Sequence, residues 1–291
     1  MSGPTAATGR WLCIWMVCRA CDRDRGSRAR TRHQNRRTGG HDMDDSKSFE
    51  LALRKQIDAK YLRPPAAGNP FVRLVAGELP RADCQEVYGG MLGSLLTFNQ
   101  VLLPRLLRNA PSVSHRVELM SVIAPEWGTT GPKDAHPTFF LEFLRALGVD
   151  VSAAMMANAL ETPEVREEAR YLRSLSQLEL LARILVGETL GPKVFAVLAE
   201  ALQKTYGLTP RATLYFTLHA HRDKKDADIL FGIVSREART DAEQRSVQRV
   251  IDESYDYGRY AQYGCAISDR IDYDFTRLFD RRRTTRPVAR A

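Results

Sequence analysis

Apolar residues recur at intervals of three or four along most of residues 43–280. This spacing is typical of amphipathic helices, and no stretch shows the sustained apolar–polar alternation of half-buried strands. Short segments rich in glycine and proline separate the apolar runs. The pattern therefore predicts an all-α bundle of seven or eight helices. The predicted helices cover residues 45–62, 80–109, 111–125, 138–148, 162–190, 191–207, 210–236 and 240–271.

Proline and glycine set the predicted ends and bends of these helices. Pro104 should kink the helix over 80–109, because an interior proline removes a backbone hydrogen bond. The pair Gly191–Pro192 should end one helix and start the next. Thr162 and Pro163 are typical of a helix start, with proline at the first helical position.

The net charge of the 291-residue chain is +8, but the basic residues are concentrated at its two ends. Residues 1–42 carry +6 and residues 281–291 carry +5, which leaves −3 for the part between them. A body with this balance lacks the basic surface that nucleic-acid binding requires, so we expect no nucleic-acid partner.

The same distribution predicts the domain organisation. Residues 19–42 contain almost no large apolar residues, and residues 1–42 are expected to form a disordered basic tail. A helical domain should span 43–275, followed by a basic tail over 276–291. We expect a chain that starts at Met43 to fold and function without the N-terminal tail.

Cysteine content and hydropathy indicate a reduced, cytoplasmic protein. Outside the N-terminal tail the cysteines are Cys84 and Cys265, too few for a disulfide framework. Cys18 and Cys21 form a C-x-x-C pair in the tail, but no second pair completes a zinc site. The apolar run over 11–17 is far shorter than the about 20 residues that span a membrane, so we expect no membrane partner.

One predicted helix carries an unusual polar stripe. In the segment "LYFTLHAHRDKKDADILF", His219, Asp223 and Asp226 stand at i, i+4 and i+7 and share one helix face between apolar ends. The stripe is either a solvated surface or a set of metal ligands that face the core. Helix bundles build metal sites from inward-facing Glu, Asp and His on several helices.

Three other residues have the right chemistry at places where burial is expected. Glu188 follows the apolar run "LLARILV", Glu126 ends the apolar helix "LMSVIAPE", and His136 opens the next helix. Each alone has an ordinary explanation, as a helix-end acid, a cap or a surface group.

Together with their surroundings, these residues resemble the heme-oxygenase-like diiron oxidase/oxygenase superfamily. This group shares its helical fold with pyrroloquinoline-quinone synthase (PqqC) and the TenA thiaminases. The resemblance covers about residues 80–235. It is carried by "EVYGGMLGSLLTFNQVLLPRLLRNAP", "HPTFFLEFLRALGVD", "GETLGPKVFAVLAEALQKTYGL" and "YFTLHAHRD".

The resemblance implies a set of iron ligands on a heme-oxygenase-like bundle. They are Glu126, His136, Glu188, His219 and Asp223. This sequence departs from the family motif His-x-x-x-Asp-x-x-His at one position, because Asp226 stands where the last His is usual. A carboxylate also ligates iron or manganese, so the departure bears on metal count and identity more than on binding. His221 points away from His219 around the helix and is no substitute.

The resemblance also implies a function. The expected enzyme is a non-heme iron, O2-dependent oxidase/oxygenase acting on a small amino-acid-like or carboxylate metabolite, by N-oxygenation or oxidative C–C cleavage in specialised metabolism. It implies two Fe(II) per chain, with manganese as an alternative, and O2 as co-substrate. Expected partners are the small-molecule substrate and a second copy in a homodimer, with an electron donor left open. Residues expected around the ligands are Tyr88, Gln100, Trp127 and Tyr215, for which ordinary packing is the alternative.

Two other functions remain open at this point. One is a metal-free enzyme like PqqC or TenA, in which Asp226 marks an altered site. The other is a non-catalytic helical interaction module with His219 and Asp223 exposed to solvent. Classical heme binding needs a His on an early helix, and residues 43–110 contain none.

Overall fold

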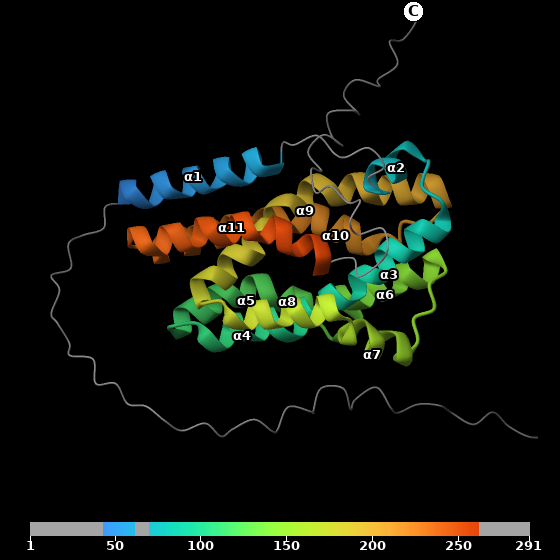
Figure 1. Cartoon of the computed structure of the whole chain (residues 1–291), viewed down its shortest axis with the longest axis horizontal. Coiled ribbons are helices and arrows are strands. Elements are labelled where there is room, and N and C mark those ends of the chain that lie inside the picture. Colours follow the sequence, from blue (N-terminus) through green and yellow to red (C-terminus); the bar gives the residue numbers. More distant parts are fainter. Residues whose placement is uncertain (1–42, 62–69, 262–291) are drawn as a thin grey trace, which may run out of the picture. The chain divides into compact units, whose positions relative to one another are not determined.

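Every regular element in the described part of the chain is a helix (Figure 1). The computed structural model describes residues 43–61 and 70–261, which belong to one compact unit, His41–Ala291. The predicted tails over 1–42 and 276–291, and Cys265, lie outside the described residues. The predicted all-α bundle is confirmed.

The described residues form eleven α-helices and two short helices of other types. The α-helices are α1 (Met43–Tyr61), α2 (Pro70–Ala76), α3 (Arg81–Thr97), α4 (Leu103–Asn109), α5 (Val113–Trp127), α6 (His136–Leu147), α7 (Ala153–Glu161), α8 (Pro163–Ser174), α9 (Gln177–Tyr206), α10 (Leu214–Glu237) and α11 (Asp241–Ala261). A π-helix, η1 (Phe98–Leu102), joins α3 to α4, and a 3-10 helix, η2 (Pro132–Asp134), precedes α6. The number exceeds seven or eight because α2 and α7 form in predicted connections and because two predicted helices divide, while the helix predicted over 191–207 is part of α9.

Helices α9 and α10 form the most extensive helix pair of the bundle, and α2, α4 and α11 also pack against α9. The core beside this pair is aromatic. The ring of Tyr88 lies 5.0 Å from that of Phe143 and 5.6 Å from that of Phe216, in edge-to-face geometry. Edge-to-face pairs add stability beyond the area that they bury. These rings therefore pack α3 and α6 against the first turn of α10.

The helix predicted over 80–109 is interrupted just before Pro104 by a π-turn. The backbone N–H of Leu103 bonds to the carbonyl of Phe98, five residues back, within η1. The side-chain amide of Asn99 donates from Nδ2 to the carbonyl of Leu95 at 3.0 Å. Such a turn bulges the helix by one residue, and π-turns are frequent at functional sites.

The predicted break at Gly191–Pro192 is wrong. Helix α9 runs through both residues as one helix of 30 residues. Proline removes one backbone hydrogen bond there, and packing against α10 holds the helix together in spite of that loss. The break occurs earlier, at Ser176, whose hydroxyl accepts from the N–H of Glu179 while the Glu179 carboxylate accepts from the N–H of Ser176. This capping box was readable in "SQLE".

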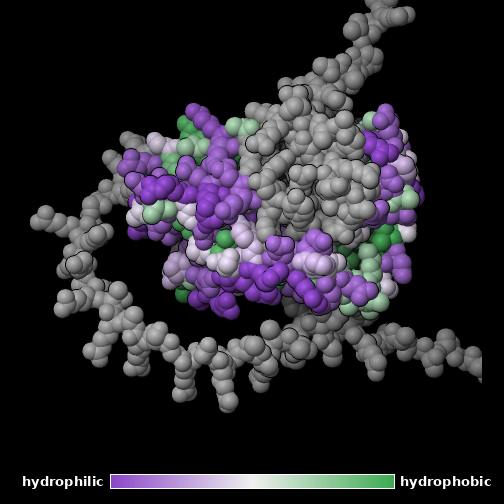
Figure 2. All heavy atoms as spheres, in the orientation of Figure 1, coloured by the Kyte–Doolittle hydropathy of each residue, from purple (hydrophilic) through white to green (hydrophobic). Residues whose placement is uncertain are grey.

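Hydrophilic side chains dominate the described part of the face shown in Figure 2. Within residues 43–61 and 70–261, no helix combines the length and apolarity that a membrane span requires. Most of the buried residues in this part of the chain are apolar.

Candidate metal centre

The six residues predicted as metal ligands lie together in the interior of the bundle. All are buried, and they come from four helices. Their ligand atoms form two groups of three, and within each group the atoms lie within 4.8 Å of one another. One group is Glu126, His136 and His219, and the other is Glu188, Asp223 and Asp226.

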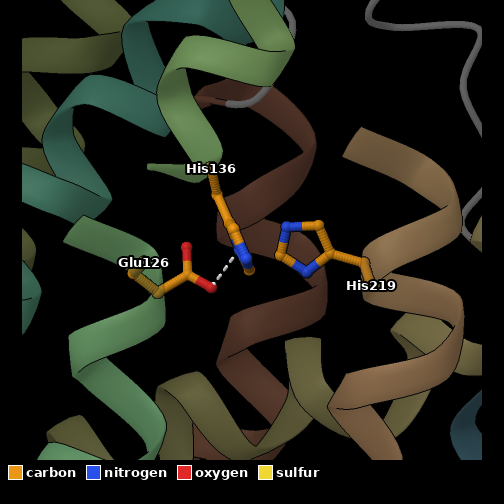
Figure 3. A group of neighbouring side chains, drawn as sticks. All are labelled: Glu126, His136 and His219. Atoms are coloured by element: carbon orange, nitrogen blue, oxygen red, sulfur yellow. Dashed lines mark ion pairs between the residues drawn. The ribbon is translucent and has the colours of Figure 1, made fainter. Parts of the chain in front are cut away.

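In the first group, three side chains from three helices point toward one another (Figure 3). Glu126 lies near the end of α5, and His136 is the first residue of α6. Nδ1 of His136 lies 2.6 Å from Oε1 of Glu126. The rings of His136 and His219 have centroids 4.5 Å apart at 73°. The group therefore presents two imidazoles and a carboxylate to one small volume.

The loop between α5 and α6 brings Glu126 and His136 together. Gly128 has a φ of 88°, a conformation that favours glycine, and an added Cβ would lie 2.1 Å from the carbonyl oxygen of Gly131. Only glycine therefore permits this reversal of the chain one residue after Trp127. The tight turn returns the chain so that the start of α6 faces the end of α5.

In the second group, all three residues are carboxylates on the α9–α10 pair. Glu188 comes from α9, and Asp223 and Asp226 come from α10. A Cβ added at Gly191 would lie 1.9 Å from Oδ2 of Asp223. Gly191 therefore leaves the room that the Asp223 carboxylate occupies against α9, a role that its reading as a helix breaker missed. The sequence offered one signal for this role, because Gly191 follows the candidate ligand Glu188 by three residues.

A hydrogen bond joins the two groups. Nδ1 of His219 lies 2.9 Å from Oδ1 of Asp223. Since a carboxylate accepts, the imidazole donates from Nδ1, and the lone pair of neutral His219 is then at Nε2. That Nε2 is buried and has no hydrogen-bond partner among the described residues. A metal-ligating His usually has this arrangement, with its other nitrogen bonded to a carboxylate or carbonyl.

The short contact between Glu126 and His136 is poorly aligned for a hydrogen bond. Nδ1 of His136 is buried and has no well-formed hydrogen bond within the described part of the chain, although it touches the carboxylate. Two such nitrogens, on His136 and His219, are thus buried without the partners that buried polar groups normally have. Both nitrogens are suited to binding a cation.

The carboxylates perturb one another strongly. Burial raises the pKa of Glu188 well above its ordinary range, and the charges of Asp223, Glu126 and Asp226 raise it further. Burial also raises the pKa of Asp223 despite the opposing effect of His219. Four carboxyl groups at close range in the interior must be neutralised, either by protons or by metal cations.

The pKa values of Glu126 and His219 shift in the directions that favour their charged forms. Burial opposes the charged form of Glu126, but His136, His219 and Arg222 together hold its pKa below the usual value. Burial likewise opposes the charged form of His219, and the neighbouring Asp223 and Glu126 raise its pKa above the usual value.

Asp226, the residue that departs from the family motif, is buried with the others. Arg222, one turn before it, donates from Nε to its Oδ2 at 3.1 Å. Burial nevertheless raises the pKa of Asp226 to about 6, because the nearby Asp223 opposes the effect of Arg222. Arg222 therefore offsets part of the negative charge of the second group.

A cavity of about 180 Å³ adjoins these residues and is lined by Glu126, Glu188, His219 and Asp223. Of the four residues expected around the ligands, Tyr215 lines the cavity, and its ring lies 4.5 Å from that of His219. Tyr88 lies instead in the aromatic core, Gln100 is exposed, and Trp127 is half-buried. Among the described residues that line the cavity, none of these three is present.

The sequence interpretation missed several residues of the cavity. Phe195 of α9 packs on His219 with ring centroids 5.2 Å apart, and Phe98 lines the cavity from the π-turn. A polar set, Ser94, Glu168 and Arg183, lines it as well. The sequence could have indicated Ser94, Glu168 and Arg183 only as polar residues within the apolar patterns of three separate helices.

The arrangement fits a divalent metal. Two imidazoles and four carboxylates form a mixed nitrogen and oxygen ligand set that suits iron or manganese. The buried, unpartnered Nε2 of His219 is suited to bind a cation. The solvated-stripe alternative is wrong, because His219 is 7% and Asp223 3% exposed.

One comparison with known proteins, with a family model, agrees with this fit. The model of a family described as iron-containing redox enzyme matches residues 94–259, which include all six candidate ligands. No curated protein matches the chain significantly. A solved structure from Shewanella denitrificans OS217, a domain of unknown function with a heme oxygenase-like fold, is 15% identical with a TM-score of 0.49. The match covers 86% of this chain and 98% of that one.

Proposed function

Since this chain belongs to the iron-containing redox enzyme family, we propose that it is a non-heme diiron, O2-dependent oxidase or oxygenase. Its substrate in this proposal is a small carboxylate or amino-acid-like metabolite. The membership supports an oxidoreductase in general, and the resemblance of the sequence to heme-oxygenase-like enzymes is confirmed at that level.

The observation that carries the proposal is the pair of adjacent three-residue groups. Four buried carboxylates carry more negative charge than Arg222 offsets, and buried charges are normally paired or bound to metal. Two divalent cations would compensate this negative charge. One ion would be held by Glu126, His136 and His219, and the other by Glu188, Asp223 and Asp226.

Iron bound there supplies redox chemistry with O2, because a mixed nitrogen and oxygen ligand set leaves coordination positions open. The surrounding residues prepare the site. Asp223 holds the proton at Nδ1 of His219, so that Nε2 is free to ligate. The rings of Tyr215 and Phe195 pack on the imidazole, fix its orientation and exclude water from one side.

Asp226 makes the second group wholly carboxylate. Compared with an imidazole, a third carboxylate is a harder, anionic donor. One oxygen of this carboxylate, Oδ2 of Asp226, also accepts a hydrogen bond from Arg222, which competes with a metal ion for it. We therefore propose that the second ion is held more weakly than the first and exchanges more readily with manganese.

The test is anaerobic loading with Fe(II), removal of free metal, and metal counting on the full chain. We expect about two irons per chain, and a stopped-flow optical change with O2 that depends on an added amino or fatty acid. Glu188→Gln should lose the second iron. Glu200→Gln, an exposed position on the same helix, is the matched control and should keep both.

Two results would count against the proposal. Iron content that is unchanged in Glu188→Gln would reject the assigned ligands. A chain that retains no iron yet converts a small molecule would favour the metal-free alternative related to PqqC and TenA.

A further inference from the structure

The cavity beside the candidate metal centre is also lined by a polar cluster that the metal does not need, formed by Ser94, Glu168 and Arg183. We propose that Arg183 binds the carboxylate of the substrate, and that the substrate is a monocarboxylic acid whose apolar body fills the cavity. This inference rests on the proposed function, whose substrate class it narrows.

The cluster joins three helices. Oγ of Ser94, on α3, donates to Oε2 of Glu168, on α8, at 2.9 Å. Nη2 of Arg183, on α9, donates to Oε1 of the same carboxylate at 3.3 Å. Glu168 is 4% exposed, and the side chain of Arg183 is 14% exposed. The Glu168 carboxylate thus holds the guanidinium in a defined orientation at the cavity.

Arg183 has hydrogen-bonding capacity to spare. A guanidinium carries five N–H donors, and one is given to Glu168. Its Nε is buried and lacks a hydrogen-bond partner among the described residues. A buried donor without a partner is rare in folded proteins, which points to a ligand that completes it. The planar fork of arginine matches a carboxylate in two-point contact.

The cluster favours an acid over an amine. Each Glu168 oxygen already accepts a hydrogen bond, one from Ser94 and one from Arg183. The remaining carboxylates that line the cavity belong to the candidate metal centre. The unsatisfied group is therefore the cation, and the ligand that satisfies it is an anion.

The rest of the cavity accommodates an apolar body. Among its lining residues are Met91, Leu95, Phe98, Ile184 and Phe195. Arg183 and Glu188 are five residues apart on α9, so their backbones are separated by about 7.5 Å along the helix axis. A molecule with its carboxylate at Arg183 therefore extends past apolar side chains toward the candidate metal centre. The atom that reacts would lie several bonds from the carboxylate.

A purely structural role for Arg183 predicts a different outcome. If the ion pair only joins α8 to α9, substitution of either Arg183 or Glu168 would lower the stability of the chain. Neither substitution would then change which ligand the chain prefers. As a binding residue, Arg183 sets the preference for acids, whereas removing the charge of Glu168 leaves its cation available. The two roles are therefore separated by selectivity rather than by stability.

The experiment is calorimetric titration of the full chain with hexanoate and 3-phenylpropionate, each paired with its primary amide. We expect the wild-type chain to bind each acid at least tenfold more tightly than its amide. Arg183→Gln should abolish that preference, and Arg183→Lys should keep part of it. Glu168→Gln should retain most of it, because the amide oxygen of glutamine still accepts the hydrogen bond that orients Arg183. Arg249→Gln, which removes an ion-paired arginine of α11, is the matched control and should leave the preference unchanged.

The titrations are run on the metal-free chain and again after anaerobic Fe(II) loading. A wild-type chain without a preference for acids, or a preference that survives in Arg183→Gln, overturns the inference. So does a preference that appears only after iron loading and is independent of Arg183, since the acid would then bind the metal. If the chain retains no iron but its preference for acids depends on Arg183, the diiron function fails and the anion site stands.

Discussion

Nδ1 of His219 donates to Oδ1 of Asp223 across 2.9 Å, one turn apart on α10, and so couples the two ligand groups of the candidate centre. His219 belongs to the group with Glu126, and Asp223 belongs to the group with Glu188. Displacement of either side chain would therefore disturb both groups. This coupling makes α10 the helix on which the site most depends.

Substitution of His219 should remove metal binding with little change elsewhere. His219→Ala deletes a ligand of one group and the partner of Asp223 in the other, so we expect iron affinity to fall by at least tenfold. His221→Ala is the control, because His221 lies two residues further on the same helix and is exposed. Anaerobic Fe(II) titration with metal counting measures both, and equal iron content in the two variants would contradict the assignment.

Gly191→Ala should weaken metal binding through steric contact alone. The added methyl group would lie 1.9 Å from Oδ2 of Asp223, so the carboxylate must move. We expect at least a tenfold loss of iron affinity. Gly232→Ala on α10 meets no atom within 4 Å, and should keep iron while raising the free energy of unfolding by about 0.5–1 kcal/mol. Fe(II) titration and urea unfolding of the two variants test this, and full iron content in Gly191→Ala would refute it.

The charge of Asp226 should make the metal-free protein less stable as pH rises. Its pKa in the folded chain is about 6, above the ordinary value of 3.8, so the folded state holds a proton that the unfolded state has lost. Stability therefore falls between about pH 4 and pH 6 and stays lower above that range. Asp226→Asn removes the titration and should be more stable than the wild type by about 2–3 kcal/mol at pH 7, with a much smaller difference near pH 4.

Urea unfolding of the chelator-treated chains from pH 4 to pH 7 measures this difference. After Fe(II) loading the order should reverse at pH 7, because only the wild type retains all three carboxylates of the second group. A stability difference that is the same at every pH would show that Asp226 does not titrate in this range.

The start of α9 should contribute to stability but not to metal binding. Ser176→Ala removes the side-chain half of the capping box with Glu179, which costs about 0.5–2 kcal/mol. Thermal unfolding should show the loss, while Fe(II) content stays at the wild-type value. A loss of iron in this variant would mean that the position of α9 is less firmly held than its packing against α10 indicates.

Much of the fold and the ligand set was predictable from local pattern. Helical periodicity depends on neighbours three and four residues apart, so it is legible in the sequence, and the all-α prediction is confirmed. The ligand residues were found because charged and imidazole side chains within apolar segments are rare. The family resemblance predicted that four of them would lie in one site, and the structure brings these together: Glu126, His136, Glu188 and His219.

What the sequence by itself determined was the succession of helices and the chemical types available on each. The tertiary structure decided how the Gly191–Pro192 pair is used, because packing between α9 and α10 overrides the local tendency of proline to end a helix. It also decided that Tyr215, and not Tyr88 or Gln100, lies at the cavity, and that Ser94, Glu168 and Arg183 meet there. The proximity of these side chains depends on contacts between helices far apart in the chain, and periodicity along one helix does not encode such contacts.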